Sequence, residues 1–377
     1  MIPINKPLIL KERKGSTECI TQQLSQFLPN KHIYITFSAR QGLDVIYKHL
    51  YKSQGTLNVA VSPLTCFEAL YPIINNHHNI HFIDINSRTL NMNEKLIPDD
   101  VDVIQAIHFG GNPQDMDKIT SLAIKNKQIV IEDCAQGFGS LYKNKFVGSF
   151  GEYSVFSFVK TLYGLAGGFV VSGSNLDLPE YKKLGLIPTY YRILKRILES
   201  KNSYNSQIVN FILYNCVLSL RPEDLSIFYK EYTVNEKIID SIYSQLLNSE
   251  ILLKKRIENA HYILDRIDAD RASGQHILPE ATSNYTRLYL TLENSSSKEV
   301  IIRMREKGVG ANHLTQNSIE FYQNSIFENP YLLKFSEKTD LPNYREIHDR
   351  VLSLPVSPNL SEDEMDYITQ NFNYFTK

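Results

Sequence analysis

The apolar positions along the chain form short runs that alternate with helical stretches. The runs at 32 to 37, 57 to 63, 79 to 85 and 101 to 109 are rich in Ile, Val and Phe, as buried strands are. Amphipathic segments such as 39 to 52 separate them. Strands and helices that alternate in this way are typical of a mostly parallel sheet covered by helices. The pattern therefore predicts an α/β fold.

The chain is too long for one compact core, since single cores rarely grow beyond about 250 to 300 residues. Its 377 residues suit a large domain with a smaller one. We expect an N-terminal arm over 1 to 30, a large domain over 31 to 245 and a smaller C-terminal domain over 246 to 377. A long helix from about 235 to 267 is expected to link the two domains.

The alternation of strands and helices stops between about 180 and 230, where two or three helices are expected. One run, 208 to 220, is largely apolar. It is too short to span a bilayer, which takes about 20 residues. Two interpretations remain open for this insertion. It is either a helical addition that packs on its own subunit, or a lid or patch that touches a membrane or a partner.

Two strand ends carry the side chains that one cofactor requires. The run at 128 to 131 leads to Asp133, and the run at 153 to 158 leads to Lys160. Open α/β sheets place their ligands at this edge. Pyridoxal phosphate needs a carboxylate to keep its ring nitrogen protonated and a lysine to form a Schiff base with its aldehyde. We therefore predict Asp133 and Lys160 as catalytic residues; the alternative is a surface ion pair.

Longer motifs carry a resemblance to a known family. The chain resembles the nucleotide-sugar aminotransferases of the DegT family, within the aspartate-aminotransferase fold (fold type I) of pyridoxal phosphate enzymes. The passages that carry the likeness are HFGGNPQDMDKI at 108 to 119, IEDCAQGFGS at 131 to 140, YKNKFVGSFGEYSVFSF at 142 to 158 and RVLSLPVSPNLSEDE at 350 to 364. The resemblance implies a mostly parallel seven-stranded sheet sandwiched by helices, a smaller C-terminal α/β domain, an N-terminal arm packed on that domain, and a homodimer.

The resemblance also implies where the cofactor phosphate lies. It belongs at the helix that Ser38 caps, because a helix N-terminus directly after a strand binds anions. The family usually has a glycine and a hydroxyl residue where this chain has Ala39 and Arg40. Arg40 would replace the hydroxyl by a charge-assisted hydrogen bond, or it lies on the solvent face of the helix. Ser157 is the expected second phosphate contact, and Gln136 is expected to reach the ring hydroxyl.

Three further positions depart from the family pattern. Cys66 aligns with the aromatic residue that stacks on the ring, so either Phe67 covers the ring or it belongs to the core. Glu231 and Thr233 replace an Asn and an Arg that reach the partner's cofactor phosphate, so this contact is expected to be lost or moved.

The lysine loop is shorter than in many relatives, because only two residues separate Ser157 from Lys160. A shorter spacing occurs in other branches of the same fold. No other lysine lies between Lys145 and Lys182. Lys160 is therefore the Schiff-base candidate in this region.

The resemblance implies an aminotransferase that uses pyridoxal 5'-phosphate, which takes the pyridoxamine form during turnover. The expected substrates are glutamate and a nucleotide-linked keto-6-deoxysugar, aminated at C3 or C4 for a surface polysaccharide or glycoconjugate. His108, Arg287 and His313 are candidate substrate contacts, with ordinary structural roles as the alternative. Two other functions stay open: a sugar dehydratase or another pyridoxal phosphate enzyme, and a non-catalytic regulatory relative.

Composition narrows the partners and the compartment. Because 40 basic residues face 41 acidic ones, no overall field favours nucleic acid or an anionic membrane. The cysteines show no C-x-x-C pair and no zinc or disulfide spacing, and no metal site is predicted. The first residues lack the apolar core of a signal peptide, so a reduced, cytoplasmic protein is expected. The cysteines are Cys19, Cys66, Cys134 and Cys216.

Overall fold

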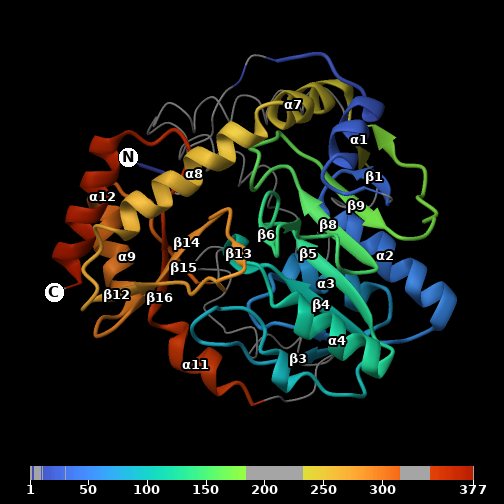
Figure 1. Cartoon of the computed structure of the whole chain (residues 1–377), viewed down its shortest axis with the longest axis horizontal. Helices are drawn as coiled ribbons and strands as arrows, with labels where there is room; N and C mark the ends of the chain where they lie inside the picture. The colour runs from blue at the N-terminus through green and yellow to red at the C-terminus, as the bar shows by residue number, and fades with distance from the viewer. Residues whose placement is uncertain are drawn as a thin grey trace, which may run out of the picture.

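A computed structural model describes residues 2–3, 10, 12–29, 31–183, 232–314 and 340–376. Two sheets dominate it, and Figure 1 shows them side by side, the larger on the right and the smaller on the left. Each sheet has its own apolar core of buried side chains.

The larger sheet has seven strands, in the spatial order β1-β9-β8-β5-β4-β2-β3. All of its neighbouring strands pair in parallel except β9, which is antiparallel to β8 and to β1. The expected mostly parallel seven-stranded sheet is therefore confirmed. The strands are β1 (His32–Thr36), β2 (Asn58–Val61), β3 (Asn79–Phe82), β4 (Val103–Ile107), β5 (Ile129–Cys134), β8 (Tyr153–Ser157) and β9 (Gly168–Ser172).

Helices cover both faces of this sheet. Successive strand residues point to opposite faces, and on β8 Val155 joins one core cluster while Phe156 joins another. The first face is covered by α2 (Ala39–Gln54) and α3 (Phe67–Asn75). The opposite face is covered by α1 (Thr17–Ser25), α4 (Met116–Asn126) and α7 (Glu236–Leu246).

The smaller sheet is antiparallel throughout, in the order β12-β14-β16-β15. Helices α8, α9 and α12 pack on it, and α12 begins with a capping box in which Ser361 and Glu364 bond each other's backbone N–H. The elements are α8 (Ser249–Leu264), β12 (Ala272–Gly274), β14 (Leu288–Leu292), α9 (Ser297–Glu306), β15 (Asn312–His313), α11 (Pro342–His348), β16 (Val351–Leu354) and α12 (Glu362–Phe375).

The N-terminal arm contacts both cores. Ile2 pairs with Val309 beside the smaller sheet. By contrast, α1 packs on α7 and β1 and places Ile20 and Leu24 in the core of the larger sheet. Among the described residues of the arm, Ile2 therefore contacts the smaller sheet, whereas α1 contacts the larger one. The domain boundaries themselves stay a prediction.

The expected long helix is two helices, because α7 ends at Leu246 and α8 begins at Ser249. Asn248 lies between them, and its side-chain amide donates to the Ser244 carbonyl at 2.8 Å. This local bond ends α7 where the sequence pattern suggested continuation.

The predicted insertion at about 180 to 230 lies largely outside the described residues. Its two ends meet, because β10 (Lys182–Lys183) pairs in parallel with β11 (Tyr232–Thr233). Among the helices that the structure describes, none is long and apolar enough to cross a membrane.

A third, short sheet joins the two parts of the chain. It has the order β13-β6-β7, made by β6 (Leu141–Tyr142), β7 (Lys145–Phe146) and β13 (Ala281–Thr282).

Candidate active site

A cavity of about 240 Å³ opens at the carboxyl ends of the parallel strands, with Ile107, Asp133 and Ser157 in its wall. Tyr289 of β14 and Leu314, just after β15, close it from the small-domain side. The cavity therefore lies where the two parts of the molecule meet. The predicted cofactor residues that line it are Ala39, Arg40, Cys66, Asp133, Gln136, Ser157 and Lys160.

Asp133 is the next-to-last residue of β5 and is only 3% exposed. Its Oδ1 accepts the Ala135 N–H at 3.1 Å, and its Oδ2 accepts from the Gln105 amide at 3.5 Å. Burial raises the pKa of Asp133, and the Lys160 ammonium opposes this shift. Amine and carboxylate are thus electrostatic neighbours in one cavity, as their strand-end positions predict.

The loop that carries Lys160 is held at several points. Its ends meet through the hydrogen bond from the Phe158 N–H to the Gly167 carbonyl, at 3.1 Å. Arg256 of α8, which is 1% exposed, donates to the Thr161 carbonyl at 2.6 Å and lies over the Tyr163 ring. Helix α8 therefore supports the short loop that carries Lys160.

The first turn of α2 forms one end of the cavity. The Ser38 hydroxyl oxygen caps this helix by accepting the Gln41 N–H at 3.2 Å. The Arg40 guanidinium lies in the cavity wall and pairs with Glu68 of α3, at 3.6 Å. Arg40 thus does not project to solvent from the outer face of the helix.

Cys66 and Phe67 have different surroundings. Cys66 lines the cavity, and burial raises the pKa of its thiol to about 11. Phe67 is absent from the cavity wall; it packs against the core cluster and lies 6.1 Å from the Tyr71 ring. The geometry therefore matches the core alternative for Phe67.

Gln136 follows Asp133 by three residues and lines the same cavity. Its Oε1 accepts the Gly110 N–H at 2.9 Å. Because the amide oxygen is used in this bond, the amide nitrogen is the group left to donate into the cavity.

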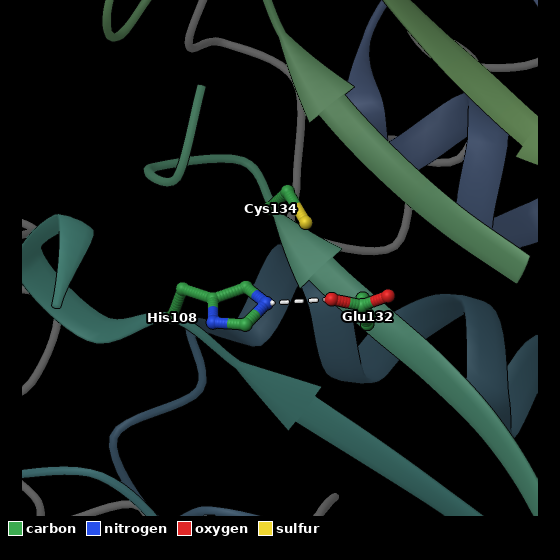
Figure 2. Close-up of side chains that lie close together, drawn as sticks. All are labelled: His108, Glu132 and Cys134. Atoms are coloured by element: carbon green, nitrogen blue, oxygen red, sulfur yellow. Dashed lines mark hydrogen bonds and ion pairs between the residues drawn. The ribbon is translucent and has the colours of Figure 1, made fainter. Parts of the chain in front are cut away.

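His108 lies outside the cavity wall and is fully buried. Its Nδ1 accepts the Gln114 N–H at 3.0 Å, so Nε2 carries the proton that it donates to Glu132 Oε2 at 3.2 Å (Figure 2). Both ring nitrogens are therefore engaged inside the protein. A substrate contact through His108 has no geometric support.

Cys134 lies beside this pair in Figure 2, and the three side chains are close enough to hold a metal ion. The bonding argues against an ion there. Glu132 also accepts the N–H groups of Gly148, Phe150 and Gly151, at 2.6 to 2.7 Å. Because both oxygens of Glu132 and both nitrogens of His108 are occupied, these two side chains have no free lone pair for a metal.

Arg287 and His313 are also absent from the cavity wall. The Arg287 N–H bonds the Gly110 carbonyl at 3.2 Å, and burial lowers the pKa of its guanidinium. The His313 ring lies 4.6 Å from that of His348.

Glu231 lies outside the described residues. Thr233 lies in β11, beside Tyr232, whose carbonyl accepts from Gln41 of α2 at 3.1 Å.

Several wall residues were not foreseen from the sequence. Phe109 and Tyr289 stack with their ring centroids 4.7 Å apart, and both line the cavity together with Glu68 and Leu314. Phe109 follows a strand that ends at the correct edge, which was an available signal. Tyr289 and Leu314 come from the smaller sheet, and no local pattern shows which of its residues face the larger one.

Comparison with known proteins follows the same lines. The chain is 24% identical to GDP-perosamine synthase of Escherichia coli O157:H7, over 99% of this chain and 98% of that protein. Its fold is similar to that of PseC, an aminotransferase involved in pseudoaminic acid biosynthesis in Helicobacter pylori (TM-score 0.74, 18% identity, 100% and 99% of the two chains).

Its fold is also similar to that of an E. coli GDP-4-keto-6-deoxy-D-mannose-3-dehydratase with bound hydrated PLP (TM-score 0.72, 16% identity, 98% and 100% of the two chains). A family model matches residues 15–183 and 241–373, which is most of the chain. The chain therefore belongs to the DegT/DnrJ/EryC1/StrS aminotransferase family.

Proposed function

We propose that the chain transfers an amino group from glutamate to a nucleotide-linked keto-6-deoxysugar, at C3 or C4, for a surface polysaccharide or glycoconjugate. The coarser assignment, a sugar aminotransferase that depends on pyridoxal phosphate, follows from its family. One observation carries the proposal: the amine of Lys160 and the carboxylate of Asp133 line one cavity at the carboxyl edge of the sheet.

The residues of the cavity fit the cofactor. One end offers the N-terminus of α2 with Ser38 and, nearby, Ser157, which are suitable for a phosphate group. The wall also holds two small residues, Ala135 and Cys66, which leave room for a ring. Asp133 and Lys160 complete a donor set of one acid and one amine.

Bound pyridoxal phosphate supplies an aldehyde that carries amino groups and a ring that withdraws electrons when its nitrogen is protonated. Asp133 would hold the proton at that nitrogen, and the two bonds to its oxygens from Ala135 and Gln105 would orient it. Lys160 would hold the cofactor at rest, and its freed amine would then remove a proton from, or return it to, the substrate carbon that bears the nitrogen. The Gln136 side-chain amide would donate a hydrogen bond to the hydroxyl oxygen on the cofactor ring.

The test is amine transfer itself. Purified protein with pyridoxal phosphate and ¹⁵N-glutamate is offered a panel of nucleotide-linked keto-6-deoxysugars, and products are weighed by mass spectrometry. We expect one sugar to gain ¹⁵N and the Lys160→Ala variant to lose this activity. Lys145→Ala, which changes an exposed lysine outside the cavity, is the matched control. Transfer that survives Lys160→Ala contradicts the assignment.

A second candidate, a sugar dehydratase, is favoured by the fold similarity to the E. coli 3-dehydratase. The same assay separates the two, because a dehydratase product loses oxygen and gains no nitrogen. Binding of the cofactor with no turnover on any sugar would instead favour a non-catalytic regulator, to which the altered residues Ala39, Cys66 and Glu231 also point.

We further propose a homodimer, because the cleft in this fold is completed by a neighbouring subunit. Sedimentation of the purified protein tests this part of the proposal. A monomer that transfers nitrogen at full rate would contradict it.

A further inference from the structure

Two buried polar side chains connect Asp133 by hydrogen bonds to the interior of the protein. Gln105 of β4 and Tyr47 of α2 are both 0% exposed. The Tyr47 hydroxyl is 2.5 Å from Gln105 Oε1, and Gln105 Nε2 is 3.5 Å from Asp133 Oδ2. The three side chains form one chain of hydrogen bonds that runs from the helix, across a strand, to the carboxylate.

The direction of these bonds is fixed by chemistry. An ionised carboxylate only accepts hydrogen bonds, so Gln105 must present its N–H group to Asp133 and its oxygen to Tyr47. Tyr47 must then donate. Burial, with Asp133 nearby, raises the pKa of Tyr47 well above its ordinary value, so its hydroxyl keeps the proton that this bond needs. Tyr47 thus stabilises the orientation of the Gln105 amide that Asp133 requires.

The fold places this pair in register with the cavity. Ile107 of β4 pairs with Asp133 of β5, and Ile107 lines the cavity. Gln105 lies two residues earlier on β4, so its side chain is on the same face as that of Ile107. The neighbouring positions on this face, Val103 and Ile107, are apolar members of the core.

A buried polar pair in an apolar core loses hydration, and a hydrogen bond restores only part of that free energy. An apolar pair of similar volume would fill the space between α2 and β4 without this loss. The pair therefore serves something other than packing, and the group at its open end is Asp133.

We propose that Gln105 and Tyr47 are positioning residues that keep Asp133 ionised and directed at the ring nitrogen of the cofactor. The inference rests on the proposed function, because it assigns a partner to Asp133. Burial raises the pKa of Asp133, whereas the Lys160 ammonium, the Ala135 N–H and the Gln105 amide lower it. Gln105 thus supports the charge that burial disfavours.

The test compares three substitutions. Gln105→Leu removes the donor. Gln105→Glu keeps the shape but replaces the amide by a second carboxyl group, which competes with Asp133 for ionisation. Tyr47→Phe removes only the hydroxyl that fixes the amide. Gln114→Leu is the matched control, because Gln114 is another buried glutamine, 1% exposed, whose amide donates to the Met92 carbonyl and does not contact Asp133.

The main readout is the pH at which the visible absorption band of the lysine-linked cofactor changes form. When the ring nitrogen of the cofactor loses its positive charge, the nitrogen that links the cofactor to Lys160 holds its proton more tightly. The midpoint of the titration then moves to higher pH. We expect an upward shift of about half a pH unit or more in Gln105→Leu and Gln105→Glu, and a smaller one in Tyr47→Phe. We also expect kcat to fall by about tenfold or more, with KM changed by less than about threefold.

Thermal unfolding of each variant shows whether it is folded at the temperature of the assay. A midpoint that stays at the wild-type pH in folded Gln105→Leu and Gln105→Glu overturns the inference, while a wild-type band that Lys160→Ala abolishes leaves the proposed function intact. An equal shift in Gln114→Leu also overturns it, because any buried amide would then have the same effect. A wild-type protein with no visible band overturns both.

Discussion

Glu132 and Asp133 are adjacent on β5, and they serve opposite faces of the sheet. Asp133 points into the cavity. Glu132 points away from it and accepts hydrogen bonds from three backbone N–H groups of the turn at 148 to 151. It also accepts a hydrogen bond from the His108 ring (Figure 2). This turn leads directly into β8, which carries Ser157 and precedes Lys160. Glu132 therefore holds the turn that leads into β8, and β8 in turn positions Lys160.

Glu132→Gln is predicted to lower the free energy of unfolding by about 2 to 4 kcal/mol, because an amide NH₂ would face N–H donors on one side of a fully buried site. Urea unfolding measures this change. Glu152→Gln is the control, since Glu152 is exposed and its substitution should stay within about 0.5 kcal/mol. Equal stability of the two variants would contradict the structural role of Glu132.

Prediction of single residues is most direct where a strand end determines their position. Asp133 and Ser157 lie at the carboxyl ends of β5 and β8, Lys160 follows β8, and all three line the cavity. It was weaker where two residues share a feature that only packing resolves. Cys66 and Phe67 stand side by side at a helix start, yet only Cys66 faces the cavity. Gln105 lies in the middle of an apolar strand, so nothing in its neighbours marks its contact with Asp133.

At the scale of elements, the segment before β14 connects the smaller sheet to the loop that follows β5 beside the cavity. Asn284 is fully buried, and its amide donates to the carbonyls of Gln136 and Phe138, at 2.8 and 2.7 Å. Its Oδ1 accepts the Thr286 N–H at 2.7 Å. Gly111 has a φ of +92°, and a Cβ there would lie 1.9 Å from that oxygen. Through this close fit and these hydrogen bonds, Asn284 joins the segment before β14 to the larger part of the molecule.

Asn284→Ala is predicted to destabilise the protein by about 2 to 3 kcal/mol, because two buried carbonyls and one N–H lose their partner. Denaturant unfolding is the measurement, and Asn294→Ala, at an exposed turn position, is the control. Loss of less than about 0.5 kcal/mol in Asn284→Ala would show that water replaces the side chain and that it does not fasten the elements.

The order of elements was largely visible in the sequence, because runs of apolar residues marked β1 to β5 and β8. The packing of α1 was not. Residues 17–25 read as a polar arm, yet Ile20 and Leu24 are enough to seat the helix in the core. The break at Leu247 and Asn248 was also hidden, since helical spacing continues on both sides of it.

At the scale of the whole molecule, α11 and β15 lie at the edge of the smaller sheet and carry a titratable pair. Burial, with His348 nearby, lowers the pKa of His313 from 6.5 to about 4. The unfolded chain therefore binds a proton between these two pH values that the folded chain does not bind. It follows that the free energy of unfolding decreases as the pH falls from about 6.5 to 4.

His313→Asn is predicted to make this decrease shallower, because up to about one proton per chain is no longer taken up on unfolding. The measurement is the slope of the unfolding free energy against pH, from urea titrations between pH 4 and 7. His77→Asn is the control: His77 is exposed, and asparagine suits its left-handed backbone, φ 64°. An unchanged slope in His313→Asn would contradict the buried neutral state of this ring.

The whole account depends on Lys160 being the residue that holds the cofactor. The direct measurement is reduction of the protein with borohydride after incubation with pyridoxal phosphate, followed by proteolysis and peptide mass spectrometry. We predict that the cofactor mass is found on the peptide that contains Lys160, and that Asp133→Asn still permits this attachment. Attachment at another lysine, or none at all, would contradict the assignment.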